Sequence, residues 1–324
     1  MDLSGSTAMK SHVISSTLLA ILLSLAWPVA SHANSDFPDR PLTLLIGFNP
    51  GGSTDVQARV LAPILAELLG QPVNLLHQPG AGGGIAAAML ASSPELGYLF
   101  QYGLSLPFTF APLATPASYD YQSFRYVAGI TLDQPALVTG PDTPFSDWQG
   151  LLDYARGNPN MVYASQNIQD RFMVNLIADQ EGLSFRIVPT TGGAGMAPLI
   201  ISGDADFAFS GGTHSAYTDS GQMRVLASLA DDRLVYYPDV PTLRELGYDV
   251  SMHAVRVVAV PANTPDSQVE ILSRALETAT RDPRFIEVTN DVIRMPVVYM
   301  DEDELNALFD SQVEEYRGLI EQYK

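Results

Sequence analysis

The sequence of 324 residues predicts an α/β fold in which short buried strands alternate with helices. Apolar runs such as Leu42–Phe48 lack alternation, which is typical of strands buried on both faces of a sheet. Segments with apolar residues at helical spacing separate these runs, so βαβ units are expected. Hydrophobic residues make up 46% and charged residues 16% of the chain. This composition supports sizeable cores and excludes intrinsic disorder.

The predicted elements follow one another along the chain. After the strand Leu42–Phe48 comes a helix whose apolar residues recur from Val56 to Leu68 until Gly70 ends it, and Pro63 should kink this helix. Further strands are expected at Val73–Leu76, Tyr98–Tyr102, Ala136–Thr139, Met161–Ser165, Phe185–Val188, Asp206–Phe209, Arg224–Ser228 and Val255–Val260. Further helices are expected at Ile85–Ala91, Ser146–Arg156 and Phe172–Asp179, from the glycine-rich loop after Pro189 to Ile201, and at Pro265–Thr280 and Asp301–Tyr323.

Residues at the helix ends support these assignments. Ser146 is a suitable N-cap, and Gly157 follows the last turn of the same helix. The last predicted helix opens with four acids, from Asp301 to Glu304. Acidic side chains there interact favourably with the positive end of the helix dipole.

Four loops rich in Gly, Ser or Thr follow strands and lead towards helices. They are Pro50–Asp55, Gly80–Gly84, Thr190–Gly195 and Ser210–Thr213. Helix N-termini carry free N–H groups and partial positive charge, and glycine lets a ligand approach the backbone closely. Such loops gather at the carboxyl ends of the strands in open α/β sheets. They predict an anion site built without lysine, although glycine turns can also simply close βα units.

Charge and composition exclude several classes of function. Lys and Arg number 17 against 36 Asp and Glu, a net charge of −19 that argues against nucleic-acid and anionic-membrane partners. The absence of cysteine excludes disulfides and thiolate sites. The five histidines have no metal-binding spacing, and no loop matches a Walker A or dinucleotide motif, so no metal and no cofactor is expected.

Catalysis has little support in this sequence. Neither Ser53 nor Ser210 lies in a GxSxG nucleophile elbow, so no catalytic residue is assigned. An exported α/β hydrolase is the least favoured alternative. Arg256 lies within an apolar strand pattern, where a guanidinium needs either an acid partner or an anionic ligand. The pattern leaves both possibilities open.

Residues 1–33 have the order of a cleavable signal peptide. Lys10 precedes an apolar run at residues 13–27, and Ser31 and Ala33 are the small residues before the expected cleavage point. The apolar run is short for a membrane span, which needs about 20 residues. Since the residue after Ala33 is not cysteine, no lipoprotein anchor is implied. We predict a soluble exported protein of residues 34–324, located in the periplasm.

Short motifs follow in order over nearly the whole exported part. They are Phe37-Pro38-Asp39-Arg40-Pro41, FNPGGSTD at Phe48–Asp55, Leu69-Gly70-Gln71-Pro72-Val73, QPGAGG at Gln78–Gly83, Val188-Pro189 with Gly192-Gly193-Ala194, PDVPT at Pro238–Thr242 and PANTP at Pro261–Pro265. Each motif is weak by itself. The ordered set resembles the periplasmic solute-binding component of tripartite tricarboxylate transporters, the TctC or Bug family.

The resemblance implies a two-lobed periplasmic-binding-protein-like (type II) fold with a ligand cleft between two α/β domains. Domain 1 would comprise residues 34–138 plus 254–324, and domain 2 residues 139–253. Crossover strands are expected near Ala136–Thr139 and His253–Val257. The implied function is capture of a small organic carboxylate, without catalysis, and its delivery to membrane permease subunits. A monomer is expected. A carboxylate sensor feeding a membrane kinase, or an orphan with a degraded pocket, are alternatives.

When the binding residues of the family are carried over by position, the resemblance implies that the ligand lies between two main loops. The expected ligand-binding residues are Phe48, Gly51, Gly52, Ser53, Thr54, Gly83, Gly84, Ser165, Asn167, Thr191, Gly192, Gly193, Ala194, Ser210, Gly211 and Arg256. Asp55 would shape the first loop without touching the anion.

The sequence also departs from the family pattern. Thr190-Thr191 replaces Tyr-Lys, Gly84 stands where many members have Asn, and Ser210-Gly211 replaces a frequent Asp-Asn. The missing Asp disfavours an amino-acid ligand. These departures favour a di- or tricarboxylate whose extra charge meets Arg256.

Overall fold

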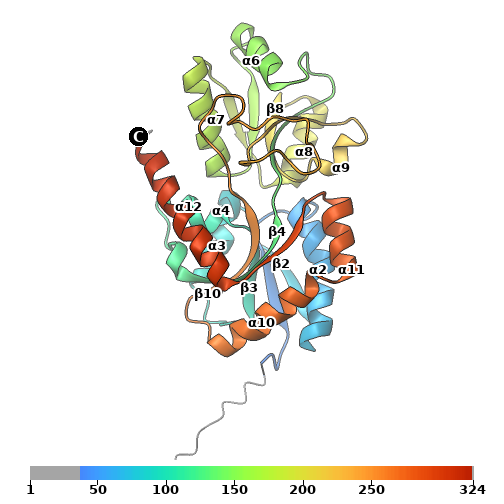
Figure 1. The fold of residues 1–324 in the computed structure, drawn as a ribbon, viewed down its shortest axis with the longest axis vertical. Helices are drawn as coiled ribbons and strands as arrows, with labels where there is room; N and C mark the ends of the chain where they lie inside the picture. Colours follow the sequence, from blue (N-terminus) through green and yellow to red (C-terminus); the bar gives the residue numbers. More distant parts are fainter. Residues whose placement is uncertain (1–36, 323–324) are drawn as a thin grey trace, which may run out of the picture. The chain divides into compact units, whose positions relative to one another are not determined.

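Two β-sheets organise the computed structural model, which describes residues 37–322 (Figure 1). The signal peptide expected at residues 1–33 lies outside the described residues. The first sheet has six strands in the order β11-β4-β10-β3-β1-β2, and the second has five in the order β7-β6-β8-β5-β9. The strands are β1 (Leu42–Ile46), β2 (Val73–His77), β3 (Leu99–Leu104), β4 (Phe124–Leu132), β5 (Pro135–Thr139), β6 (Val162–Ser165), β7 (Arg186–Pro189), β8 (Phe207–Gly211), β9 (Arg224–Ser228), β10 (Val255–Pro261) and β11 (Val297–Met300).

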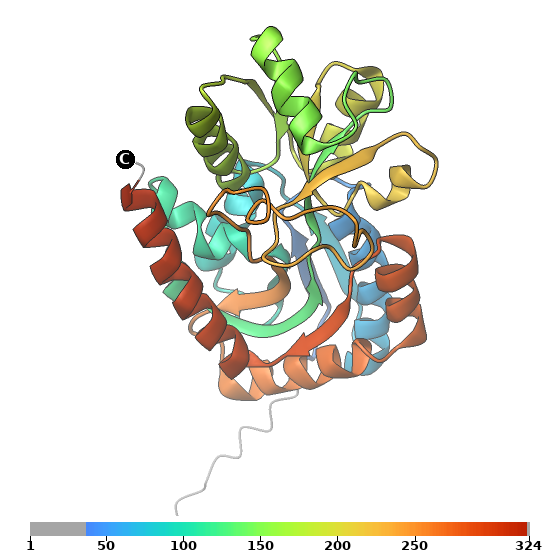
Figure 2. The same ribbon diagram turned by 45° about the horizontal axis from the view of Figure 1, so that its top comes forward.

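Helices cover both sheets, and Figure 2 shows α2, α10 and α12 around the first of them. The α-helices are α2 (Ser53–Leu69), α3 (Gly84–Ala91), α4 (Leu106–Thr109), α5 (Ala111–Ala114), α6 (Trp148–Gly157), α7 (Ile168–Glu181), α8 (Gly193–Ser202), α9 (Ser215–Thr218), α10 (Asp266–Ala279), α11 (Pro283–Ile286) and α12 (Glu302–Gln322). Short 3₁₀ turns lie at Ala81–Gly83 and Tyr121–Ser123, and a π-helix at Glu287–Val292. Helix α2 is assigned without interruption through Pro63.

The α/β class predicted from the alternation of elements is confirmed, but both sheets are mixed. Strand β1 pairs in parallel with β2 and β3, as βαβ units require. Strand β10 is antiparallel to β3 and β4, and β5 is antiparallel to β8 and β9. The expected parallel βαβ units are therefore present, and the antiparallel strands β10 and β5 add pairings that the alternation of elements did not predict. Strand β4, which pairs with β10 and β11, was not predicted at all.

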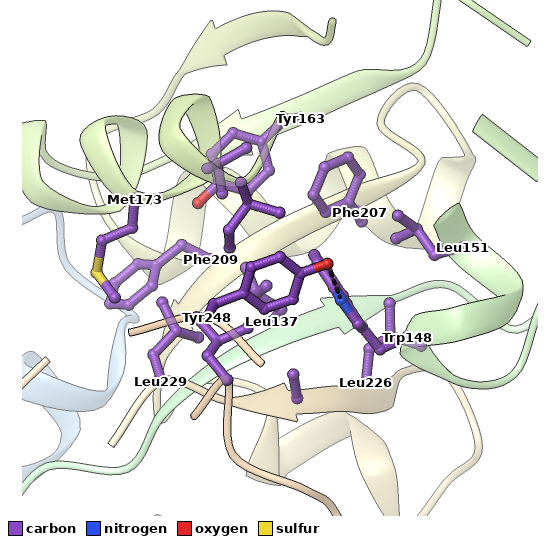
Figure 3. Packing of buried hydrophobic residues seen from close by; sticks show 14 of the residues in the cluster. Leu137, Trp148, Leu151, Tyr163, Met173, Phe207, Phe209, Leu226, Leu229 and Tyr248 are labelled. Atoms are coloured by element: carbon purple, nitrogen blue, oxygen red, sulfur yellow. Dashed lines mark hydrogen bonds between the residues drawn. The ribbon is translucent and has the colours of Figure 1, made fainter. Parts of the chain in front are cut away.

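The continuous apolar run at β1, in which apolar and polar residues do not alternate, is buried on both faces of the sheet, as its composition predicts. Leu44 and Ile46 belong to one hydrophobic cluster, whereas Leu45, which points to the opposite face, belongs to another. A hydrophobic cluster covers one face of the second sheet, with Trp148 and Tyr248 packed over it (Figure 3), and it extends to Phe48 and Leu104 at the first sheet. A separate cluster that includes Val138, Ala164 and Ala208 covers the opposite face, so both faces of this sheet are removed from water.

The chain passes between the sheets twice. Strand β4 of the first sheet is followed by Asp133 and Gln134 and then by β5 of the second. The segment 229–254 leads back from β9 to β10. The expected crossover Ala136–Thr139 thus lies within β5, and the first passage comes just before it. The residues from Phe37 onward cluster into one compact unit, so the division into two domains stays a prediction.

Candidate functional site

A small cavity lies where loops of the two sheets meet. Its lining residues are Phe48, Gly52, Ser53, Thr54, Leu104, Gln166, Gly193, Gly211 and Thr213. Its volume is about 20 Å³, which is enough for about one water molecule. A ligand larger than a water molecule therefore fits only when the loops move apart.

Two helix N-termini converge on this cavity from opposite sheets. Helix α2 begins at Ser53 after Gly52, and α8 begins at Gly193 after Gly192. Neither N-cap glycine has a side chain to satisfy the first N–H groups of its helix. A Cβ atom added to Gly52 would lie 3.7 Å from the backbone nitrogen of Ala194. The positive ends of both helix dipoles therefore face the same small space, which favours an anion.

The glycines of the α8 loop are required for two separate reasons. Gly192 has φ +103°, a conformation that L-residues rarely adopt. Gly193 has no room for a side chain, since a Cβ atom there would lie 1.8 Å from Oγ1 and 2.4 Å from Cβ of Thr213. The pair thus combines a left-handed turn with close approach of helix α8 to the end of β8.

Hydrogen bonds link the loops across the cavity. Asn49 N–H donates to the carbonyl of Thr191 at 3.3 Å, and the two side chains also bond to each other. Ser53 Oγ donates to the carbonyl of Gly211 at 3.1 Å, and Ser53 N–H donates to Thr213 Oγ1 at 3.4 Å. A ligand carboxylate at the α2 terminus would compete with Thr213 for the Ser53 N–H group.

Asp55 holds the first loop in shape. Its Oδ2 accepts hydrogen bonds from Gly51 N–H and from Arg59 Nε, both at 2.8 Å, and its Oδ1 lies 2.7 Å from His77 Nε2. Burial raises the pKa of Asp55, but hydrogen bonds from Arg59, Gly51 and His77 outweigh burial and hold that pKa below its usual value. Asp55 is thus an ionised brace for the loop, the role expected from the sequence.

We expect Asp55→Ala to weaken carboxylate binding at least about tenfold and to lower the free energy of unfolding by about 1–3 kcal/mol, because Gly51 loses its acceptor. Calorimetric titration and urea unfolding measure the two effects. Asp282→Ala is the matched control, because Asp282 also caps a backbone N–H, that of Arg284 at 2.8 Å, away from the cavity lining. The control should lose stability and keep its affinity. An unchanged affinity in Asp55→Ala contradicts the bracing role.

Arg256 lies behind the cavity and has protein partners on several sides. Its Nε donates to Asp133 Oδ1 at 3.0 Å, and its Nη1 donates to Gln57 Oε1 at 3.1 Å. Its Nη2 donates to Ser53 Oγ at 2.7 Å and to the carbonyl of Gly211 at 2.9 Å. Both side chains of the Arg256–Asp133 ion pair are 0% exposed. Of the two possibilities that the sequence left open, the acid partner is present.

Asp133 was not recognised from the sequence. It follows β4, an element that the sequence analysis also missed, and it pairs with a residue far along the chain. Burial raises the pKa of Asp133 to about 6, and the charge and hydrogen bonding of Arg256 only partly oppose this effect.

The loops that lead into α2 and α8, which the sequence predicted as the main ligand loops, meet at the cavity. The predicted residues that line it are Phe48, Gly52, Ser53, Thr54, Gly193 and Gly211. The predicted residues that flank the lining within the same loops are Gly51, Thr191, Gly192 and Ala194. Gly83 packs near Phe48, since a Cβ atom there would lie 3.7 Å from Cζ of that ring.

Other predicted residues have structural partners away from the lining. Ser165 Oγ donates to the carbonyl of Asn167 at 3.1 Å, and Asn167 Oδ1 caps α7 by accepting from Asp170 N–H at 2.9 Å. Gly84 lines a separate hollow of about 420 Å³ with Tyr119 and Arg171. Ligand contact by Ser165, Asn167 or Gly84 stays a prediction.

Three lining residues were missing from the predicted set, namely Leu104, Gln166 and Thr213. Thr213 ends one of the four loops found in the sequence, and Gln166 lies between two predicted residues. Gln166 Nε2 donates to the carbonyl of Phe209 at 2.7 Å, which ties the loop after β6 to β8. Polar residues within two positions of a strand end were the available signal for both.

Ser210 and His214 form a pair that has the composition of a catalytic dyad. Ser210 Oγ lies 3.0 Å from His214 Nδ1. Both residues are buried, and burial followed by the charge of Arg294 lowers the pKa of His214 to about 3. Such a histidine is a poor general base near neutral pH. The pair therefore fits a structural cap better than a nucleophile and base.

The described part of the chain has neither a metal-binding cluster nor a helix suited to a membrane. Residues 37–322 contain no group of three or more His, Asp or Glu side chains that could hold a metal ion. Within the same range, none of the helices combines the length and the hydropathy that crossing a membrane requires.

Comparison with known proteins identifies the family of this chain and solved structures with the same fold. A family model described as "Tripartite tricarboxylate transporter family receptor" matches residues 57–324. A UPF0065 protein from Bordetella pertussis is 31% identical over 265 residues, which cover 80% of this chain and 82% of the relative.

Two solved structures are similar over nearly their whole length. The periplasmic binding protein BugD has a TM-score of 0.81 at 23% identity, covering 88% of this chain and 98% of its own. MatC from Rhodopseudomonas palustris, solved with bound malate, has a TM-score of 0.80 at 22% identity, covering 88% and 100%. The periplasmic-binding-protein fold expected from the sequence is confirmed.

Proposed function

We propose that this chain, which belongs to the tripartite tricarboxylate transporter receptor (TctC) family, captures a small organic carboxylate at the cavity between its two loops. The observation that carries the proposal is the convergence of the α2 and α8 N-termini on one space. The lining residues of that space include no ionisable side chain. Backbone N–H groups would therefore bind the carboxylate, which reconciles an anionic ligand with the acidic composition of the chain.

A dicarboxylate is the ligand class that this geometry favours. Each loop supplies one helix N-terminus, so two loops on opposite sheets suit a ligand with a carboxylate at each end. MatC, which has the same fold, was solved with the dicarboxylate malate. Because the present cavity holds about one water molecule, the loops must separate to admit malate and close again around it.

Delivery to the membrane subunits of a tripartite tricarboxylate-type transporter completes the proposed function. The description of the family as a transporter receptor supports it, and so does the signal peptide expected at residues 1–33. The protein would act in the periplasm as a monomer, without cofactor and without chemical change to the ligand. A sensor role would use the same binding site and differ only in the membrane partner.

The test is calorimetric titration of the protein purified from the periplasm of an expression host, unfolded and refolded to remove carried ligand. The panel is malate, succinate, citrate, glutamate, terephthalate and acetate. We expect saturable one-to-one binding, strongest for a dicarboxylate, with the ligand recovered unchanged. Failure of every carboxylate to bind overturns the proposal, and conversion of a ligand to product favours an enzyme.

Delivery needs a separate measurement. Transport of the bound carboxylate into vesicles that contain the permease subunits should require this protein. Transport that proceeds equally well without it contradicts the delivery step while leaving the binding site intact.

A further inference from the structure

Asp133 has a carboxylate oxygen without a hydrogen-bond partner among the described residues. Its Oδ1 accepts from Arg256 Nε, whereas its Oδ2 is buried and unpaired. A Cβ atom added to Gly211 would lie 3.1 Å from this Oδ2. Gly211 lines the cavity, so the unpaired oxygen lies directly behind the cavity wall. A buried unsatisfied oxygen is costly and rare, and it calls for an explanation.

The partner of Asp133 contacts the same wall. Arg256 Nη2 donates to Ser53 Oγ at 2.7 Å and to the carbonyl of Gly211 at 2.9 Å, and both of these residues line the cavity. The positive guanidinium and the negative carboxylate therefore both lie one residue behind the ligand space. Charges act strongly on a ligand there, because buried surroundings screen them less than water does.

We propose that Asp133 is a specificity-determining residue that limits how much negative charge the carboxylate site accepts. The inference rests on the proposed function. While Asp133 is ionised, it neutralises Arg256, so an additional ligand carboxylate gains little from the guanidinium. Without the charge of Asp133, Arg256 would act on the ligand as an uncompensated cation. The native site therefore selects mono- and dicarboxylates over tricarboxylates. The sequence analysis instead expected a di- or tricarboxylate whose extra charge meets Arg256.

Because Oδ2 is unpaired, Asp133→Asn changes the charge at this position without removing a hydrogen bond. Asp133→Asn removes the negative charge and preserves the shape of the side chain. The amide oxygen can still accept the hydrogen bond from Arg256 Nε. The amide nitrogen takes the place of Oδ2, which has no hydrogen bond to lose. The variant thus changes charge with little change in bonding.

Several charged or titratable groups face Asp133 and enter any analysis of its pH dependence. Arg256 on β10 and Tyr102 on β3 interact with it electrostatically. The hollow beside the chain passages, of about 270 Å³, is lined by Asp133 together with Asp231, Asp232, Arg233 and His253, and by the uncharged Leu308 and Gln312 of α12. Two other buried acids, Asp55 and Asp170, bond to backbone N–H groups of the site loops.

The experiment compares malate with its monoamide, which has nearly the same size and one charge less. Both are titrated calorimetrically at pH 7.5 into the wild-type protein and into Asp133→Asn. We expect the ratio of malate affinity to monoamide affinity to rise about tenfold in the variant, because the second charge then gains from Arg256. Citrate should gain more than malate. Asp153→Asn, an exposed substitution on α6 with the same change in net charge, should leave the ratio unchanged.

A pH series on the wild-type protein provides a second measurement that needs no variant. The pKa of Asp133 is raised to about 6, so acidification protonates it and should reproduce the effect of Asp133→Asn. With affinities expressed for the fully ionised ligands, the malate-to-monoamide ratio should rise as the pH falls from 8 to 5.5. In Asp133→Asn this rise should disappear.

The outcomes separate this inference from the proposed function. If malate and its monoamide bind but their affinity ratio changes neither in Asp133→Asn nor with pH, the inference is overturned and the proposed function stands. Equal losses for both ligands assign Asp133 a purely structural role, which also overturns the inference. If no carboxylate binds to the wild-type protein, the proposed function fails and the inference fails with it.

Discussion

Gly192→Asp is expected to reduce carboxylate affinity more than about 100-fold while the protein stays folded. The new carboxylate would lie at the N-cap of α8, where it can accept the hydrogen bonds that the ligand needs and repel the ligand anion. A Cβ atom at this position would also lie 3.0 Å from Cδ1 of Phe48, which forms the cavity wall. Calorimetric titration with malate measures the loss.

The fold should survive because two effects oppose each other. A side chain at φ +103° introduces backbone strain of about 1–3 kcal/mol. An aspartate N-cap stabilises the folded state by about 1 kcal/mol, because it satisfies free N–H groups of α8. Circular dichroism and thermal unfolding monitor this balance.

Two matched variants separate charge from strain in this prediction. Gly221→Asp adds the same charge at φ +71°, with no atom within 4 Å of its Cβ position, and it should bind malate normally. Gly192→Ala introduces the strain without the charge and should lose less affinity than Gly192→Asp. Wild-type affinity in Gly192→Asp would show that the ligand is not held at the α8 terminus.

Arg256→Met is expected to lower the free energy of unfolding by about 3–5 kcal/mol at pH 8. The substitution leaves Asp133 as a buried, uncompensated charge and removes a donor from Ser53 Oγ, Gly211 and Gln57. Removing one partner of a buried pair costs more than removing both. Arg256→Met combined with Asp133→Leu should therefore regain most of the lost stability.

The destabilisation should depend on pH in a defined direction. The folded-state pKa of Asp133 is raised to about 6, above its unfolded value, and loss of Arg256 raises it further. A raised pKa contributes stability that is present at low pH and is lost as the pH rises through the folded-state pKa. When the pH rises from 5 to 8, the free energy of unfolding of Arg256→Met should therefore fall further than that of the wild type.

Urea unfolding of the wild type, both single variants and the double variant at the two pH values completes a double-mutant cycle. If Arg256→Met lowers the free energy of unfolding by less than about 1 kcal/mol at pH 8, the substitution has removed no more than an ordinary hydrogen bond would contribute. That result would show that Asp133 has another source of compensation in the folded protein.

Local residue patterns account for much of the fold and of the two loops. The unalternated apolar run at Leu42–Phe48 predicts a strand buried on both faces, and the structure places its neighbouring residues in different clusters. The glycine pair after Pro189 predicts a tight turn into a helix, and α8 begins at Gly193. Burial pattern, turn chemistry and helix start depend on adjacent residues, so they can be inferred from the chain alone.

Contacts between distant residues decide the rest of the site. Whether β10 runs parallel or antiparallel to β3 depends on how the chain returns from the second sheet, which no short motif encodes. Gly193 needs to be glycine partly because Thr213 lies against it, 20 positions along the chain. Arg256 carried a visible signal as a cation in an apolar strand, but the identity of its partner, Asp133, depended on packing. Charge pairing is a property of three-dimensional distance, and only the folded chain brings the two groups within 3.0 Å.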